Sequence, residues 1–329
     1  MHIFIDESGS FTRSPGANSI SVVGALTIPD TQLGRVDRHY QSIRRTLPKE
    51  NGEVKGRKLS EPEIARVVTM LAARDVLFEV NAIDLALGTD AEIATHQTEQ
   101  ADRITAGITP KHGPPAVQLA NNLRARLEAS SSQLYIQSIL TFSLIARVLD
   151  HSTMYYVQRR PKELGAFHWV VDAKERLKTT DWEEWWSYMV MPMLQSKSVK
   201  EPMPMIIGQD YSHFRRFDME TPAYLTEINE APKSGLVADI RKIMTENFRF
   251  SSGIETGLEL VDILTNATRR ALVGNLKIEG WGNIRRLMIH RREQCISVVA
   301  IGCIPKGHRP AFTSVIRHFG GGGRSMFAH

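Results

Sequence analysis

The 329-residue chain has few cysteines and no long apolar run. Only Cys295 and Cys303 are present, too far apart for a paired metal-ligand motif, and they predict reduced thiols of a cytosolic protein. The longest apolar stretch, Ile139 to Leu149, is interrupted by Thr, Ser and Arg and falls short of a membrane span. Asp6 and Glu7 stand where the apolar region of a signal peptide would lie. We therefore expect a cytoplasmic protein with no membrane partner.

The net charge is mildly basic, and most of the basicity comes from arginine. The 41 Lys and Arg residues exceed the 36 Asp and Glu residues by five, and the pI is near 9.2. Paired arginines suit bidentate contact with phosphates, although scattered solubilising charge is an alternative. The best-placed pairs predict nucleic-acid contacts at Arg269, Arg270, Arg285 and Arg286. The choice between DNA and RNA stays open, as does the oligomeric state.

The first nine residues combine a short apolar run with two adjacent carboxylates. The run from His2 to Ile5 predicts a strand, and Ser8-Gly9 predicts the turn that ends it. Alternation places Asp6 and Glu7 on opposite faces of that strand, so one of them points toward the core. A buried carboxylate is costly unless a cation neutralises it. Asp6 is therefore a candidate site residue, with an Asp that caps the turn through its own backbone as the alternative.

The segment from Gly253 to Leu272 predicts a helix with an acidic stripe on an otherwise apolar surface, and Ser252 is available as its cap. Four polar side chains fall within about 60° of one another on this helix, namely Glu255, Glu259, Asp262 and Asn266. Like charges at i,i+4 repel, so Glu259 beside Glu255 is unfavourable without a counter-ion. A bound divalent metal accounts for this pattern. The alternative is a mostly buried helix whose only solvent-exposed edge is acidic.

Two further carboxylates occupy positions that suit a site. The continuous apolar run 167–171 predicts a strand covered on both faces, with Asp172 at its carboxyl end. In α/β sheets, ligand crevices form at that end of the strands. Glu53 and Lys55 lie in the polar segment 52–56 between two helical patterns, where a solvated loop is the alternative.

Taken together, these segments resemble the domain of unknown function 3800 family. The resemblance rests on an ordered set of elements, namely the DESG signature at Asp6–Gly9, Glu53-x-Lys55 after the first helix, Asp172 closing a middle strand, and Asp262-Ile263-Leu264 on a late helix. It covers the chain from Ile3 to about Ala271. That family resembles the ribonuclease H-like nucleases in its fold and in its acidic constellation.

The resemblance implies a nuclease that hydrolyses phosphodiester bonds with two Mg²⁺ or Mn²⁺ ions. Position by position, it implies that Asp6, Glu53, Asp172 and Asp262 bind the metals and carry catalysis, with Lys55 beside them. We expect Asp6 to bridge both ions, Asp172 and Glu53 to complete one site, and Asp262 with Glu259 to hold the other. Lys55 would offset charge in the transition state.

The chain departs from the family pattern in two places. The family commonly has Gln and Ala before the late Asp, where this chain has Glu259 and Val261, and an acid often follows the DESG signature, where this chain has Ser10. The roles of Glu255, Glu259 and Glu7 as ligands therefore stay open. The alternative function is a catalytically inactive nucleic-acid- or partner-binding module of a defence or mobile-element system.

The predicted fold class is α/β, with a ribonuclease H-like mixed sheet flanked by helices and carrying helical insertions. Strands are expected at 2–6, 19–28, 76–84, 167–172 and 203–208, and helices at 31–47, 61–73, 116–150 (with a break near Gln137-Ser138) and 181–194. Residues 88–115 predict an inserted lobe or mobile loop, 209–234 a loop, and Gly320–Gly323 a flexible tail. We expect one domain over 1–329, with an inserted helical region at 88–150 and a C-terminal extension at 275–329.

Overall fold

The apolar runs of the sequence form the strands at the centre of the molecule. A computed structural model describes residues 1–13, 19–109, 112–173, 180–221, 236–290, 295–302 and 310–328. The central sheet contains β1 (His2–Ser8), β2 (Ile20–Ile28), β3 (Leu77–Asp84), β4 (His168–Asp172), β7 (Phe248–Ser251) and β8 (Ser297–Val299). Its six strands lie in the order β7-β4-β1-β2-β3-β8. The pairs β1–β2 and β2–β3 are antiparallel, whereas β1–β4, β4–β7 and β3–β8 are parallel.

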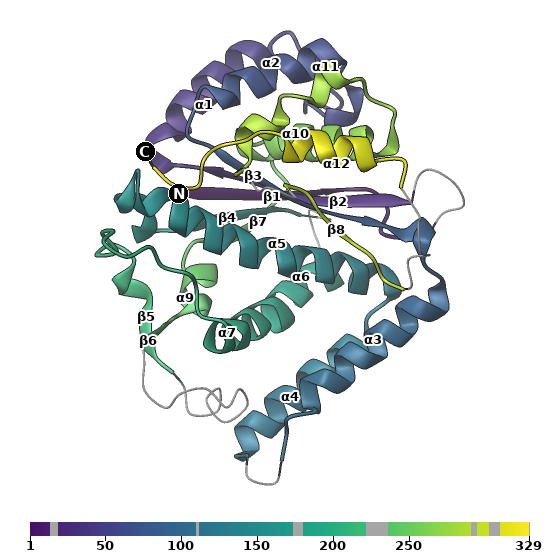
Figure 1. Cartoon of the computed structure of the whole chain (residues 1–329), viewed down its shortest axis with the longest axis vertical. Coiled ribbons are helices and arrows are strands. Elements are labelled where there is room, and N and C mark those ends of the chain that lie inside the picture. Colours follow the sequence, from purple (N-terminus) through teal and green to yellow (C-terminus); the bar gives the residue numbers. More distant parts are fainter. Residues whose placement is uncertain are drawn as a thin grey trace.

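Helices cover both faces of this sheet, which confirms the α/β class with a mixed sheet (Figure 1). One face carries α1 (Asp30–Arg44), α2 (Glu61–Ala72), α10 (Thr256–Val273), α11 (Ile278–Trp281) and α12 (Thr313–Gly320). The other carries α5 (Ser132–Val157), α6 (Asp181–Trp185), α7 (Met191–Lys200) and α9 (Ile240–Thr245). The helices α3 (Asp90–Thr105) and α4 (Pro114–Ala129) form a hairpin that projects from this second side (Figure 1).

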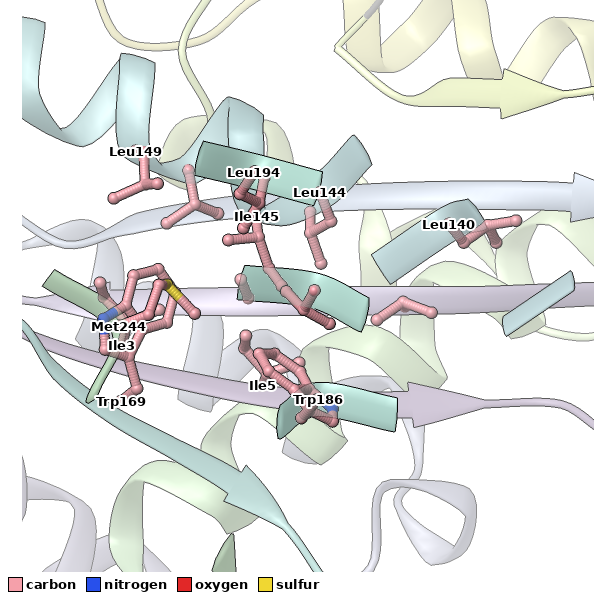
Figure 2. Packing of buried hydrophobic residues seen from close by; sticks show 14 of the residues in the cluster. Ile3, Ile5, Leu140, Leu144, Ile145, Leu149, Trp169, Trp186, Leu194 and Met244 are labelled. Carbon is pink, nitrogen blue, oxygen red and sulfur yellow. The ribbon is translucent and has the colours of Figure 1, made fainter. Parts of the chain in front are cut away.

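Alternation along β1 sends successive side chains into two different cores. Ile3 and Ile5 pack on the α5 side, where Trp169 and Trp186 are also buried (Figure 2). Phe4 packs in the other core, beneath α10. Asp6 continues the Phe4 face and therefore lies on the α10 side of the sheet, with 8% of its surface exposed. The predicted separation of Asp6 and Glu7 onto opposite faces follows from the same alternation.

Several predicted boundaries are wrong for local reasons. The predicted helix 116–150 is two helices, because the chain breaks at residues 130–131 and Ser131 caps α5 by accepting a hydrogen bond from the Leu134 amide. Gln137 and Ser138 lie inside α5. The stretch 88–115 contains α3, which Thr89 and Glu92 begin with a capping box. The late helix begins at Thr256, with Glu255 at its cap position.

Residues 203–208 do not form a strand, contrary to prediction. Pro202 and Pro204 remove backbone donors there, and proline is poorly tolerated in a sheet. The described part of the predicted loop 209–234 contains the 3₁₀ turn Arg215–Phe217 and β5 (Asp218–Glu220), which pairs with β6 (Leu236–Ala238) in a second sheet. Residues 222–234 of that predicted loop lie outside the described residues.

The helix α5 is long and apolar enough, by length and composition, to cross a membrane, contrary to the expectation that no stretch approaches that length. It spans 26 residues, and 56% of its most apolar window is buried inside the protein. It packs against β2 and β3. Within the described residues, α5 is thus a core helix on one face of the sheet. The cytoplasmic location stays a prediction.

The C-terminal segment is fastened to the body, so the predicted flexible tail after Gly320 is wrong. The Arg324 amide donates to the Met288 carbonyl, and the His290 amide donates to the Arg324 carbonyl, both at 2.8 Å. The Arg324 guanidinium also donates to the Arg74 carbonyl. The thiol of Cys295 is buried close by and contacts the Gly322 carbonyl. Cys303 lies outside the described residues.

Gly257 allows the first turn of α10 to lie directly on β1. A Cβ atom at this position would lie 2.3 Å from ring carbons of Phe4. We expect Gly257→Ala to lower the free energy of unfolding by about 2 kcal/mol, because overpacking outweighs the better helix propensity of alanine. Gly34→Ala in α1 is the matched control: its Cβ would meet nothing closer than 3.7 Å. The control should gain about 0.5–1 kcal/mol. Urea denaturation measures both, and a stabilised Gly257→Ala would contradict the packing.

Candidate functional site

Asp6 and Asp172 lie side by side at the carboxyl ends of two parallel strands. The last residues in register between β1 and β4 are Ile5 and Val171, so Asp6 and Asp172 follow on neighbouring strands. Such strands are about 4.8 Å apart. Ile5 and Val171 pack on the α5 side, so the next side chains both point toward α10. The two carboxylates therefore share one face of the sheet at the end where ligand crevices form.

The helix α10 crosses above this end of the sheet and adds Asp262. Its neighbour one turn later, Asn266, donates from Nδ2 to Oγ of Ser8 at 3.2 Å, which fixes α10 over the end of β1. Asp262 Oδ2 accepts a hydrogen bond from the Gly56 amide at 2.7 Å. Gly56 approaches the helix so closely that a Cβ would lie 2.8 Å from Cα of Ile263. Asp262 thus stands between the sheet and the loop before the 3₁₀ turn Gly56–Lys58.

The loop of residues 50–56 presents Glu53 and Lys55 next to Asp262. Asn51 and Gly52 both have positive φ, 52° and 83°, as the Asn-Gly pair of a tight hairpin turn requires. Beyond the turn, alternate amides point to α10, with Val54 N donating to Glu259 Oε1 at 2.8 Å and Gly56 N donating to Asp262. Glu53 and Lys55 alternate with these anchored residues and form an ion pair, Nζ to Oε1, of 2.6 Å.

We call Asp6, Glu53, Lys55, Asp172 and Asp262 the acidic cluster. The charges of its last four members affect the pKa values of Lys55, Asp172 and Asp262. Burial raises the pKa of Asp172 to about 6; Lys55 opposes this rise, while Glu53 and Asp262 add to it. Burial likewise raises the pKa of Asp262, against the opposing effects of the Gly56 amide and Lys55. Burial lowers the pKa of Lys55, but the surrounding carboxylates more than offset it, so its net pKa is raised. Residues from three distant parts of the chain therefore sense each other's charge.

The raised pKa of Asp172 predicts that the metal-free protein loses stability as the pH rises. Between its ordinary value of 3.8 and about 6, the folded state holds the proton more tightly than the unfolded state, so unfolding becomes easier across this window. A rise of this size corresponds to about 3 kcal/mol. We expect Asp172→Asn to be more stable than wild type at neutral pH, with the difference shrinking toward pH about 4. Denaturation curves in chelator measure this; a pH-independent difference would contradict it.

Glu259 does not stand free to bind a metal, so its predicted ligand role is corrected. Its side chain is 1% exposed and accepts hydrogen bonds from Nε and Nη2 of Arg44 at 2.7 and 2.8 Å. The Val54 amide also donates to Oε1 of Glu259. Arg44 Nη2 donates in addition to the Gly52 carbonyl at 2.6 Å. Glu259 therefore anchors the loop that carries Glu53 and Lys55. Its partner Arg44 was not among the predicted site residues.

The rest of the predicted acidic stripe is neutralised by protein groups. Glu255 binds the Arg249 guanidinium through both oxygens and accepts from Ser251. The hydrogen bond from the Arg249 guanidinium is the largest influence on the pKa of Glu255, and it lowers that pKa. The expected repulsion between Glu255 and Glu259 is thus relieved by two arginines rather than by a metal. Asp262 is thus the one member of the stripe that belongs to the acidic cluster. Glu7 of β1 is not part of the cluster either, because it lies on the opposite face of the sheet from Asp6.

Three of the four arginines predicted to contact nucleic acid donate hydrogen bonds to backbone carbonyls. Arg269 Nε donates to the Ile20 carbonyl at 2.7 Å, and burial lowers the pKa of Arg269. Arg270 Nη1 donates to the Leu59 carbonyl at 2.8 Å. Arg285 Nη1 donates to the His318 carbonyl at 3.3 Å, and only Arg286 of the four is exposed. The first three guanidinium groups therefore hold backbone carbonyls, and their contact with phosphates stays a prediction.

The acidic cluster has the oxygen donors that a hard cation prefers, but its carboxylates are not gathered closely enough to hold one. Carboxylate oxygens are the donors that Mg²⁺ and Mn²⁺ prefer. Within the described ranges, however, no group of three or more His, Cys, Asp or Glu side chains is gathered closely enough to hold a metal ion. Like charges repel, and Glu53 pairs with Lys55 while Asp262 is held by the Gly56 amide. A cation would draw the carboxylates together.

Comparison of the chain with protein-family models, with curated proteins and with solved structures found no match. The family resemblance seen in the sequence therefore stays a prediction, and the function is argued from the acidic cluster.

Proposed function

We propose that the protein is a metal-dependent nuclease of ribonuclease H-like type, in keeping with its resemblance to the domain of unknown function 3800 family. The observation that carries the proposal is the placement of Asp172 near the carboxyl end of β4, on the α10 side of the sheet. Asp262 of α10 holds the Gly56 amide of the loop that carries Glu53 and Lys55. Asp6 joins them from the neighbouring strand. Buried ionisable groups with perturbed pKa values are typical of functional sites. A purely structural cluster of this kind would be expected to have its charges matched in pairs, as Glu259 and Glu255 do.

The sheet supports the ribonuclease H-like part of the proposal. Its three opening strands are antiparallel, and β4 then returns parallel to β1 with its carboxyl end beside that of β1. The helix α10 covers the same end and contacts both β1 and β2. This arrangement is compatible with the opening of a ribonuclease H-like sheet.

The residues that would hold two Mg²⁺ or Mn²⁺ ions are Asp6, Asp172, Asp262 and Glu53. Bound there, the ions would supply an activated water and stabilise the leaving oxygen of a phosphodiester. The protein's own groups contribute in other ways. Asp172 is ionised above a pKa of about 6 and is available as an oxygen ligand at neutral pH. Lys55 keeps its ammonium beside these carboxylates, where it can offset charge on a phosphate.

One observation favours the second candidate, a binding module that does not cleave. Lys55 neutralises Glu53 at 2.6 Å, and the carboxylates of the described residues stand apart. In a binding module that does not cleave, this ion pair would persist when Mg²⁺ or Mn²⁺ is added. Cleavage by the purified protein separates the two candidates.

The test is a panel of single- and double-stranded DNA and RNA, incubated with the protein and Mg²⁺ or Mn²⁺, and again with chelator. The nuclease proposal expects cleavage of at least one member that requires metal and stops with chelator. Tight binding of one member without any cleavage would favour the binding module. The salt dependence of that binding would report how many phosphates the surface contacts.

A further inference from the structure

A cavity of about 420 Å³ lies on the α5 side of the sheet, away from the acidic cluster. It is bounded by the end of α3, by α4, by Phe142 of α5 and by α7. Figure 1 shows the α3–α4 hairpin and α7 below the sheet, with α10 and α1 above it. The volume falls within the range of small-molecule sites, about 300–1,000 Å³.

The floor of this cavity is apolar. It is formed by partly buried side chains that rest on the core beneath them, namely Ile104, Leu119, Phe142 and Met193. Water contacts this surface when the cavity is empty, so covering it with an apolar group is favourable. The floor therefore suits the apolar part of a ligand.

The rim of the cavity is basic. Arg103, Lys197 and Lys200 line it, against the single carboxylate of Glu201. Lys197 pairs with Glu201. Arg103 and Lys200 are exposed, and neither makes an ion pair with another described residue. The three cationic groups of the rim therefore exceed its single carboxylate by two positive charges.

The walls of the cavity are held in place by contacts outside it. Arg124 of α4 binds Asp102 and Thr105 of α3 at 2.7 and 3.1 Å, which fixes the hairpin. Arg126 stacks over the ring of Tyr188, 4.1 Å from its centroid, and joins α4 to the π-helical segment Trp186–Val190 before α7. These contacts join α3, α4 and the segment before α7 around the cavity.

We propose that this cavity binds an amphipathic anion, a small molecule with an apolar body and one carboxylate or phosphate group. The apolar body would cover the floor, and the anionic group would lie between Arg103 and Lys200. A neutral molecule of the same shape loses the charged contact, and a cationic one meets repulsion. The proposal does not depend on the nuclease activity, because the cavity and the acidic cluster share no residue.

Calorimetric titration with four ten-carbon probes tests the ligand class. Decanoate or decyl phosphate should bind saturably at one site per chain, and which of them binds more tightly tells the carboxylate source from the phosphate source. Decanol and decyltrimethylammonium should bind about tenfold more weakly or worse, since each lacks the charged contact. Equal binding of decanol, or no saturable binding of either anion, would overturn the proposal.

Two variants locate the site. The double variant Arg103→Glu/Lys200→Glu should weaken binding of the anion about tenfold or more, whereas Arg35→Glu, an exposed arginine on α1, should leave it unchanged. Leu119→Trp should block the cavity by filling it. Thermal unfolding of each variant checks that the fold survives. Unchanged binding in Leu119→Trp, with the fold intact, would place the anion elsewhere and refute the assignment.

Discussion

Asp6→Asn is expected to reduce metal-dependent cleavage by about 100-fold or more, which corresponds to about 3 kcal/mol of transition-state stabilisation. Asn keeps the shape of the side chain and removes the charge that a bridging ligand supplies to both ions. Asp6 is 8% exposed at the end of β1, beside Asp172, so the change acts within the acidic cluster. Initial rates on whichever substrate of the panel the wild type cleaves give the measurement.

The matched control for this prediction is Asp218→Asn, which removes one carboxylate from the exposed strand β5. We expect its rate to equal that of wild type. Thermal unfolding of both variants separates loss of chemistry from loss of fold. Undiminished cleavage by Asp6→Asn would mean that the activity belongs to a contaminant or to another site.

Glu259→Ala is expected to lower the free energy of unfolding by about 3–5 kcal/mol, because it leaves a partly buried charge without its partner. The Arg44 guanidinium would lose both hydrogen bonds to the carboxylate, and the Val54 amide would lose its acceptor. The loop that carries Glu53 and Lys55 would lose its Val54 contact to α10 and keep the hydrogen bond from Gly56 to Asp262. Urea denaturation measures the loss.

Glu255→Ala on the same helix is the control for Glu259→Ala. Its partner Arg249 is 54% exposed, and exposed ion pairs contribute about 0–1 kcal/mol. If both substitutions cost the same small amount, the Arg44–Glu259 pair does not anchor the loop. If Glu259→Ala is strongly destabilised while Glu255→Ala is not, Glu259 is a structural carboxylate, as the geometry indicates.

The predictions from sequence succeeded where the pattern is local. The strand at 2–6 was predicted from its apolar run, with Asp6 and Glu7 on opposite faces, and the helix from Gly253 to Leu272 was predicted from its side-chain pattern. The four-residue strand β7 was missed because Phe248-Arg249-Phe250-Ser251 has too few residues to show a period. Its place in the sheet is set by pairing with β4, far away in the sequence.

The site could be predicted only in outline, because its partners are distant in sequence. Arg44 and Glu259 are 215 residues apart, so an acidic stripe on one helix gave no sign of the arginine that neutralises it. The same holds for Arg269 and Arg270, whose guanidinium groups reach carbonyls on β2 and beyond the first 3₁₀ turn. An arginine pair looks the same in sequence whether it faces a phosphate or a backbone carbonyl.

The most direct test of the central claim is the anomalous diffraction of crystals soaked in Mn²⁺. We expect manganese between Asp172 and Asp262, with Asp6 as a shared ligand and with Glu53 turned away from Lys55. We also expect Glu259 to keep its bonds to Arg44 and Val54. Manganese bound elsewhere, or none bound while the Glu53–Lys55 pair persists, would contradict the assignment of the acidic cluster as a metal site.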